Sequence, residues 1–207
     1  MSRQAWLLFA AMSVIWGLPY LFVKIAVTEL NPASLVLGRT LVAALVIAPF
    51  ALRHVDWRAV RSSLGWILAF GAIEMAVPWM LLSQAEKRIT SSLAGLLLAA
   101  VPLIASIVTA LLGDRSGLRG LRLAGLFIGM AGVAIIVGTN TTAGSIDATG
   151  IILMTLVAVG YACGPILLQR KLSHLPSLLV IALSLILSAI LAAPFAYGSI
   201  SSAWPLT

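Results

Sequence analysis

Apolar residues fill this chain in long blocks, and polar residues are confined to the short breaks between the blocks. Crossing the hydrocarbon core of a bilayer takes a helix of about 20 residues, and sheet edges are not tolerated there. The pattern therefore predicts an all-α, polytopic transmembrane helical bundle of about seven helices. The predicted spans are Ala5–Val27, Ala33–Leu52, Leu64–Ser83, Ile89–Leu112, Leu121–Gly138, Gly150–Leu168 and Ser177–Tyr197.

Composition leads to the same class of protein. Hydrophobic residues make up 61% of the 207 residues and charged residues only 9%, and the mean hydropathy is +1.12. A soluble protein of this size needs a charged, hydrated surface that this chain lacks. The breaks carry turn-forming residues, as in Glu29–Pro32, Gly113–Gly117 and Thr139–Ser145. None of them is long enough for an extramembrane domain, so we expect the protein to function within the lipid bilayer.

The net charge of +7 reflects topology, because most cations fall in alternate breaks. Those cations are Arg3, Arg53, Arg58, Arg61, Arg115, Arg119, Arg122, Arg170 and Lys171. The opposite side offers Lys87 and Arg88, partly offset by Glu86, and the nearby Asp147. The positive-inside rule then predicts a multi-pass protein of the inner or plasma membrane of the cell, with a cytoplasmic N-terminus and an outer C-terminus. This distribution argues against a nucleic-acid partner.

The first span resembles a secretory signal peptide, since Arg3 precedes an apolar run. The run continues past Met12 to Phe22, which is too long for a typical signal core, so we expect an uncleaved helix. The single cysteine, Cys163, lies within a span and is expected to pack as a small apolar residue. With no cysteine framework, metal cluster, nucleotide loop or nucleophile motif in view, we expect no metal, no cofactor and no enzymatic activity.

Four prolines fall near the middle of their spans: Pro19, Pro78, Pro102 and Pro165. Each removes a helical hydrogen bond and frees the carbonyl four residues earlier, which lipid cannot satisfy. Transporters build midplane sites from interrupted helices of this kind, so these prolines and the neighbouring Gly17 are candidate helix-break or gating positions. Harmless kinks, which are common in membrane helices, are an equally good explanation.

Charged residues inside the spans are few. Glu74 lies near the centre of the third span, where a charge costs a few kcal/mol and is expected to face a cavity or a partner. Because burial favours the neutral carboxyl, Glu74 is also a candidate for proton coupling. Arg39 lies in the outer third of the second span, where snorkelling and a functional role are equally plausible. Lys24 lies near the outer end of the first span, where snorkelling to the interface is the simpler explanation.

Aromatic residues add a candidate wall for a binding site. Trp16, Tyr20 and Lys24 share one face of the first helix because of their four-residue spacing. Trp79 next to Pro78, and Tyr161 near Pro165, place aromatics beside two other breaks; ordinary packing is the alternative. In the fifth predicted span, small residues at helical spacing favour close helix packing, within the monomer or in a homodimer. They are Gly125, Gly129 and Gly132.

Three motifs resemble the EamA branch of the drug/metabolite transporter superfamily. They are Ser13-Val14-Ile15-Trp16-Gly17, Asn31-Pro32 leading into Gly38-Arg39, and the run Ser91–Leu103 that continues to Leu112-Gly113-Asp114-Arg115. The resemblance covers essentially the whole chain and implies ten helices in two inverted five-helix repeats. It divides this chain into a first repeat at 1–140 and a partial second repeat, of two helices, at 148–207. Two departures stand out: the family usually has Gly-Glu where this chain has Gly113-Asp114, and Glu74 is not part of its pattern.

The resemblance implies a secondary transporter that exports small metabolites, amino acids or drugs by alternating access. A small-molecule substrate is then expected between the repeats, and protons are a candidate coupling ion. The candidate substrate-binding residues are Trp16, Tyr20, Arg39, Glu74, Trp79 and Tyr161. Relative to the ten-helix pattern, the last three helices are missing. The alternative is therefore a fragment, a scaffold or a subunit completed by a partner, which does not transport on its own.

Overall fold

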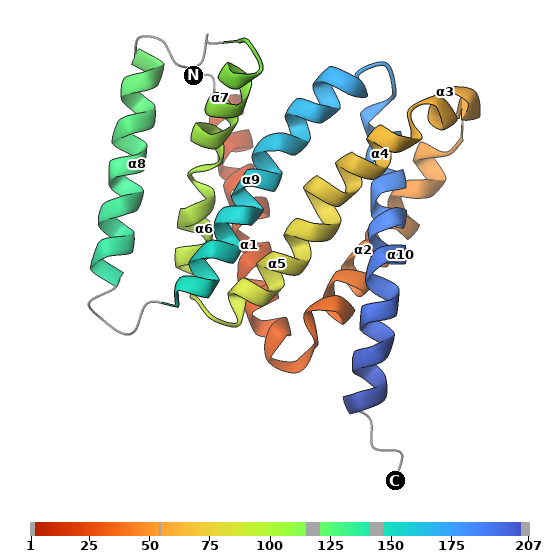
Figure 1. Ribbon diagram of the computed structural model, residues 1–207, viewed down its shortest axis with the longest axis horizontal. Coiled ribbons are helices and arrows are strands. Elements are labelled where there is room, and N and C mark those ends of the chain that lie inside the picture. Colours follow the sequence, from red (N-terminus) through yellow and green to blue (C-terminus); the bar gives the residue numbers. More distant parts are fainter. Residues whose placement is uncertain (1–2, 54, 115–120, 141–146, 204–207) are drawn as a thin grey trace.

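The fold is all-helical throughout the part of the chain that the computed structural model describes, residues 3–53, 55–114, 121–140 and 147–203 (Figure 1). This confirms the predicted class of fold. The α-helices are α1 (Arg3–Glu29), α2 (Pro32–Ala51), α3 (Trp57–Ser62), α4 (Leu64–Phe70), α5 (Val77–Glu86), α6 (Ser91–Leu98), α7 (Val101–Leu111), α8 (Leu121–Asn140), α9 (Ala148–Lys171) and α10 (Ser177–Ala203). A π-helix, η1 (Gly71–Ala76), joins α4 to α5.

Six helical segments within the described ranges are long and apolar enough to cross a membrane. They are Arg3–Glu29, Pro32–Ala51, Leu64–Glu86, Ser91–Leu111, Ala148–Lys171 and Ser177–Tyr197. The remaining predicted span, Leu121–Gly138, forms most of α8, which is not one of these six. Arg115 and Arg119, and residues 141–146 of the threonine-rich break, lie outside the described residues.

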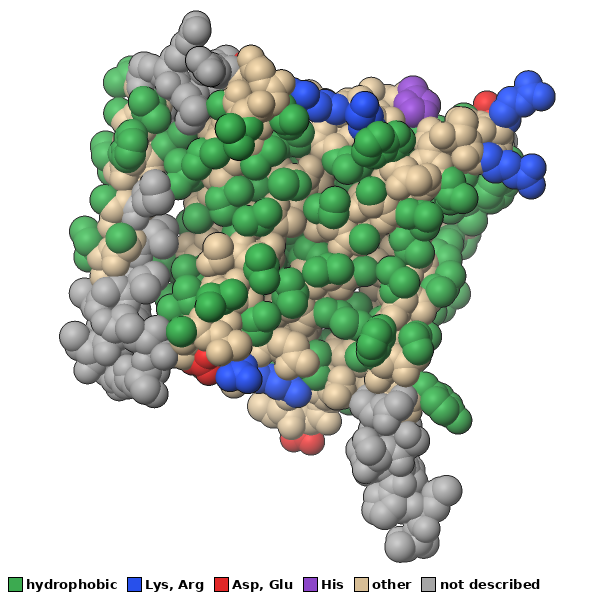
Figure 2. All heavy atoms as spheres, viewed as in Figure 1, with side chains coloured by type: hydrophobic (Ala, Val, Ile, Leu, Met, Phe, Trp, Pro, Cys, Tyr) green, Lys and Arg blue, Asp and Glu red, His purple; other side chains and the backbone are tan. Residues whose placement is uncertain are grey.

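Charged side chains gather at two opposite edges of the molecule. Figure 2 shows apolar side chains over the middle of one face, with Lys, Arg, His, Asp and Glu along the upper and lower margins of the described surface. Such a band is expected of a protein whose middle is in contact with lipid acyl chains. The protein is therefore a multi-pass membrane protein.

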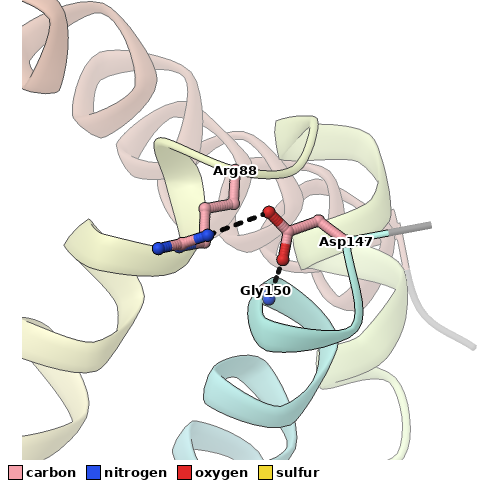
Figure 3. A network of polar contacts seen from close by, with 3 residues as sticks. All are labelled: Arg88, Asp147 and Gly150. Carbon is pink, nitrogen blue, oxygen red and sulfur yellow. Dashed lines mark hydrogen bonds and ion pairs between the residues drawn. The ribbon is translucent and has the colours of Figure 1, made fainter. Parts of the chain in front are cut away.

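Side-chain caps define where several helices begin. The Asn31 side chain accepts a hydrogen bond from the backbone of Ala33 at 3.0 Å, and Pro32 opens α2, where its missing N–H costs nothing. Asp147 caps α9 through a 3.0 Å bond from the Gly150 N–H and pairs with Arg88 at 3.1 Å (Figure 3). These caps satisfy backbone donors that have no partner within the helix.

Prolines interrupt two of the membrane-spanning segments. In Leu64–Glu86, the turn before Pro78 widens into η1, and the N–H of Val77 bonds the carbonyl of Ala72, five residues earlier. In Ser91–Leu111, the helix breaks between α6 and α7, just before Pro102. Pro19 and Pro165 lie inside the continuous helices α1 and α9. The sequence alone left open which of the four prolines break a helix, since context decides how the freed carbonyls are satisfied.

Two apolar clusters hold the bundle together, one toward each membrane edge. The first, which we call the inner cluster, lies near the loop between α9 and α10 and contains Val60, Ile67, Phe70, Leu172 and Leu179 among others. The outer cluster lies near the loop between α5 and α6. It consists of Leu82, Ala85, Ile89, Ala94, Met154 and Val157. α9 contributes to both clusters, so it links the two halves of the bundle.

The three glycines of α8 do not mark a close helix contact in this structure. α8 packs beside α6 and α7 at one margin of the bundle (Figure 1). A Cβ atom added to Gly125, Gly129 or Gly132 would meet no heavy atom of a neighbouring element within 4 Å in the described part of the chain. Close packing through these glycines, within the monomer or in a homodimer, therefore stays a prediction.

Candidate functional site

A cavity of about 620 Å³ lies between the inner and outer clusters, near the middle of the membrane-spanning segments. Its volume is in the range of small-molecule binding sites. The apolar part of the lining comes from Ile15, Pro19, Met75, Leu82, Leu98, Val101, Pro102 and Pro165. The aromatic and charged part consists of Trp16, Tyr20, Arg39, Glu74, Trp79 and Tyr161. The structure thus brings all six sequence-predicted substrate residues to one cavity, although five separate helical elements carry them.

Arg39 projects from α2 and stacks on α5. Its guanidinium carbon lies 3.9 Å from the centroid of the Trp79 ring, which is a cation–π contact. The Nη1 atom of Arg39 is buried and has no hydrogen-bond partner among the described residues. The cation is therefore held in place by a ring while part of its donor capacity is unused.

Glu74 projects from the π-helix η1 toward α9. A Cβ atom added to Gly164 would lie only 1.8 Å from the Glu74 Oε2 atom, so the carboxyl group occupies the space of an absent side chain. That oxygen is buried, and nothing in the described ranges hydrogen-bonds it. Arg39 does not neutralise it either, since the two side chains form no ion pair within 4.0 Å in the described structure. A cation and a carboxyl group thus line the same cavity without pairing.

The remaining candidates differ in their position relative to the cavity. Tyr20 and Tyr161 are half-buried and also pack against the outer cluster. Trp16 is 59% exposed, so it lies at the rim of the cavity. Pro78 is buried and does not line the cavity. Its ring lies against Gly160 of α9, so close that a Cβ atom added to Gly160 would be 2.8 Å from it. Gly17 does not line the cavity, and a Cβ there would meet open space.

Lys24 lies outside the cavity lining. Its ammonium group donates to the backbone carbonyls of Glu86 and, at 2.7 Å, of Ile89. The Glu86 carbonyl ends α5 and the Ile89 carbonyl lies in the turn that follows, where unpaired carbonyls and the helix dipole favour a cation. Lys24 thus extends to the end of the third span, and its ammonium group is held there by backbone carbonyls.

Sequence reasoning missed Glu86, which it treated as a loop residue that offsets neighbouring cations. The structure buries Glu86 completely; its Oε2 accepts a 3.0 Å bond from the Ser91 hydroxyl, and its Oε1 has no partner among the residues described. A signal was present in the sequence, because Leu82, Ala85 and Glu86 follow helical spacing and share one face. That face packs into the outer cluster.

A multi-pass helical bundle with a cavity of this kind at mid-membrane defines a polytopic membrane protein with a site of small-molecule size. The chain is a member of the EamA-like transporter family, whose model matches residues 4–138. It is also similar to the protein named "Probable amino-acid metabolite efflux pump" of Escherichia coli (strain K12), with 26% identity over 176 residues. That alignment covers 84% of this chain and 56% of the relative, so the chain spans about half of the relative's length. No solved structure gives a significant match. The division into repeats at 1–140 and 148–207 stays a prediction.

Proposed function

We propose that this chain forms the substrate-binding part of a secondary transporter that exports small zwitterions with an apolar side chain. The observation that carries the proposal is the pair of buried polar atoms at the cavity, Arg39 Nη1 and Glu74 Oε2, each without a partner in the described structure. A buried polar group without a partner is costly, so a ligand that satisfies both is favoured. A carboxylate suits the guanidinium, and an ammonium group suits the carboxyl.

The rest of the lining fits the apolar part of such a solute. Trp16, Tyr20, Trp79 and Tyr161 supply aromatic surface, and aliphatic side chains complete the wall. The name of the Escherichia coli relative, an amino-acid metabolite efflux pump, supports a substrate of this class and the direction of export. Binding at mid-membrane beside the breaks at Pro78 and Pro102 suits alternating access.

A matched set of solutes tests the proposal. We expect the purified protein in proteoliposomes to bind and transport phenylalanine better than phenylalaninamide, which lacks the carboxylate, or 3-phenylpropanoate, which lacks the amine. Arg39→Gln should abolish the preference for the carboxylate, and Glu74→Gln the preference for the amine. Equal binding of all three solutes, or unchanged preferences in both variants, contradicts the proposal.

Proton coupling through Glu74 is a separate part of the proposal. Glu74 is the acidic residue of the cavity lining, so it is the group that exchanges a proton there as substrate and solvent alternate. Flux driven by an imposed pH gradient should disappear in Glu74→Gln while exchange of substrate without a gradient persists. Full proton-driven flux in Glu74→Gln removes the coupling role and leaves substrate recognition by Arg39 untouched.

Orientation in the membrane completes the proposal. The basic residues at the edge where α1 begins and α9 ends support a cytoplasmic position for that edge by the positive-inside rule, in an inner or plasma membrane. Reporter fusions after Asp114 and after Lys87 test this. A reporter that is active only in the cytoplasm should work at the first position and fail at the second. The reverse result overturns the orientation.

A further inference from the structure

α1 is attached to the bundle near its C-terminal end. Its buried side chains in the described structure are Val23 and Val27. Toward the N-terminus the helix is open to its surroundings, with Trp6 and Trp16 each 59% exposed and Phe9 60% exposed. The contacts that hold α1 are therefore concentrated in its last two turns.

Lys24 makes the polar part of this attachment. The two carbonyls it reaches, those of Glu86 and Ile89, end α5 and lead into the turn before α6. A second, weaker tie lies beside it, because the Ser91 hydroxyl is 3.4 Å from the carbonyl of Tyr20. Since the carbonyls at a helix end have no partner within the helix, one flexible cation satisfies two acceptors and fixes three elements together.

The attachment lies at the end of the cavity where the outer cluster packs. Leu82 belongs to the outer cluster and also lines the cavity. Tyr20, Leu98 and Tyr161 pack against the same cluster and line the cavity as well. The cluster therefore separates the cavity from the edge where α1 ends, and α1 is one of the walls that must move for the cavity to open there.

We propose that Lys24 is a positioning residue that keeps the cavity closed on the side where α1 ends, by bonding α1 to the turn between α5 and α6. Opening on that side breaks both of its hydrogen bonds, which lets the end of α1 separate from the outer cluster. The inference rests on the proposed transport function, because only a transporter needs the cavity to open at both edges. It assigns Lys24 a role in gating and none in binding substrate.

Cysteine accessibility measures the proposed closure directly. Cys163 is the one cysteine of the sequence, so Cys163→Ser gives a background for Leu98→Cys, a reporter in the cavity wall. A membrane-impermeant maleimide is applied from each side of sealed vesicles. With Lys24 intact, we expect labelling from the side where α1 begins and protection from the side where α1 ends. Lys24→Met should raise the labelling rate from the protected side about tenfold, the change expected for losing a charged hydrogen bond.

Matched variants separate a gate from a general structural role. Lys24→Arg keeps the cation and its reach, so it should restore protection. Lys87→Met removes an exposed cation from the same turn and should leave labelling unchanged. Unchanged labelling in Lys24→Met overturns the proposal, and so does equal labelling of the parent protein from both sides. The second measurement needs no Lys24 variant, so it holds even where Lys24→Met fails to accumulate in the membrane.

Failure of the gate is distinguishable from failure of the transport function. If substrate is transported but the labelling rate does not depend on Lys24, the proposed gate is wrong and the proposed transport function stands. If the labelling rate depends on Lys24 but the protein neither binds nor transports any of the matched solutes, the proposed substrate class is wrong and the proposed gate stands.

Discussion

The carboxyl group of Glu74 occupies the place of a side chain on Gly164. A Cβ atom on Gly164 would lie close to three atoms of the Glu74 side chain: 1.8 Å from Oε2, 2.7 Å from the carboxyl carbon and 3.0 Å from the Glu74 Cβ. Two elements far apart in the sequence, η1 and α9, thus fit together because one carries glycine where the other carries an acid. Glycine at this position is a condition for an acidic group in the cavity wall.

Gly164→Ala is therefore expected to displace the Glu74 side chain and weaken binding of a zwitterionic solute. Loss of one charged hydrogen bond to the solute should lower its affinity about tenfold. Equilibrium binding of radiolabelled phenylalanine to the protein in detergent measures the change. Gly65→Ala is the control, because a Cβ there meets nothing within 4 Å.

A shorter acid should relieve the crowding. Adding Glu74→Asp to Gly164→Ala removes one methylene and is expected to recover part of the binding, whereas adding Glu74→Gln is not. Equal recovery by both second changes would show that Gly164 acts on helix packing alone, without positioning a carboxylate.

Gly160 is expected to behave differently from Gly164, four residues away. A Cβ there would lie 2.6 Å from the backbone oxygen of Ile73 and 2.8 Å from the Pro78 ring, and neither can move aside easily. Gly160→Ala should lower the free energy of unfolding by about 1–3 kcal/mol, the usual cost of overpacking. Thermal unfolding in detergent, with Gly65→Ala as the control, measures the change. A variant as stable as that control contradicts the close approach of η1 to α9.

The stack of Arg39 on Trp79 predicts a graded series. Trp79→Leu removes the ring that holds the guanidinium and should weaken binding of carboxylate-bearing solutes by roughly 3- to 30-fold, the range of a cation–π contact. Trp79→Phe keeps a ring and should lose less. Arg39→Lys should resemble Trp79→Leu, because an ammonium group cannot stack as a plane. Equal losses in the two Trp79 variants would count against the stack.

Asp147 gives a prediction for pH. The hydrogen bond from the Gly150 N–H, together with the Arg88 cation, lowers the pKa of the Asp147 carboxyl from its ordinary value of 3.8 (Figure 3). A lowered pKa in the folded state stabilises the fold above pH 3.8, and this contribution is lost as the pH falls through the folded-state pKa. We expect the melting temperature of Asp147→Asn to depend less on pH than that of the parent between about pH 5 and 3.

The comparison at neutral pH separates the cap from the ion pair. The amide oxygen introduced by Asp147→Asn can still cap α9, so this variant should lose only the pair with Arg88, and the loss should shrink at high salt. Asp147→Ala loses the cap as well and should be less stable than Asp147→Asn at every pH. Equal melting temperatures for the two variants at pH 7 would exclude a capping role.

The helical class and most of the membrane spans could be predicted because lipid imposes a simple rule on composition. The gathering of Trp16, Tyr20 and Glu74 at one cavity could also be anticipated, because a shared helix face and a charge deep in a span are local properties of the sequence. Whether these residues bind substrate stays a prediction. Close packing at the α8 glycines stays a prediction as well, since a small residue permits a close contact without creating one.

Features that depend on partners distant in the sequence could not be predicted. Lys24 bonds carbonyls more than 60 residues away, and Gly164 is essential only because Glu74 faces it. Glu86 looked like a loop residue because it adjoins Lys87 and Arg88. The structure buries it beside the Ser91 hydroxyl, on the face of α5 that also carries Leu82 and Ala85. Periodicity describes which face a residue occupies, whereas the neighbours of that face are set by the tertiary structure.

The π-helix before Pro78 gives the third span one residue more than a regular α-helix would hold in the same length. Its wide turn absorbs that residue, so α4 and α5 keep about the relative orientation that a continuous helix would give them. Loss of Ala72 is therefore expected to restore a regular helix while the faces of α4 and α5 stay where they are. Loss of a residue inside α5 would instead rotate everything on one side of the deletion by about 100°. The wide turn is thus the place where this membrane span tolerates a change of length.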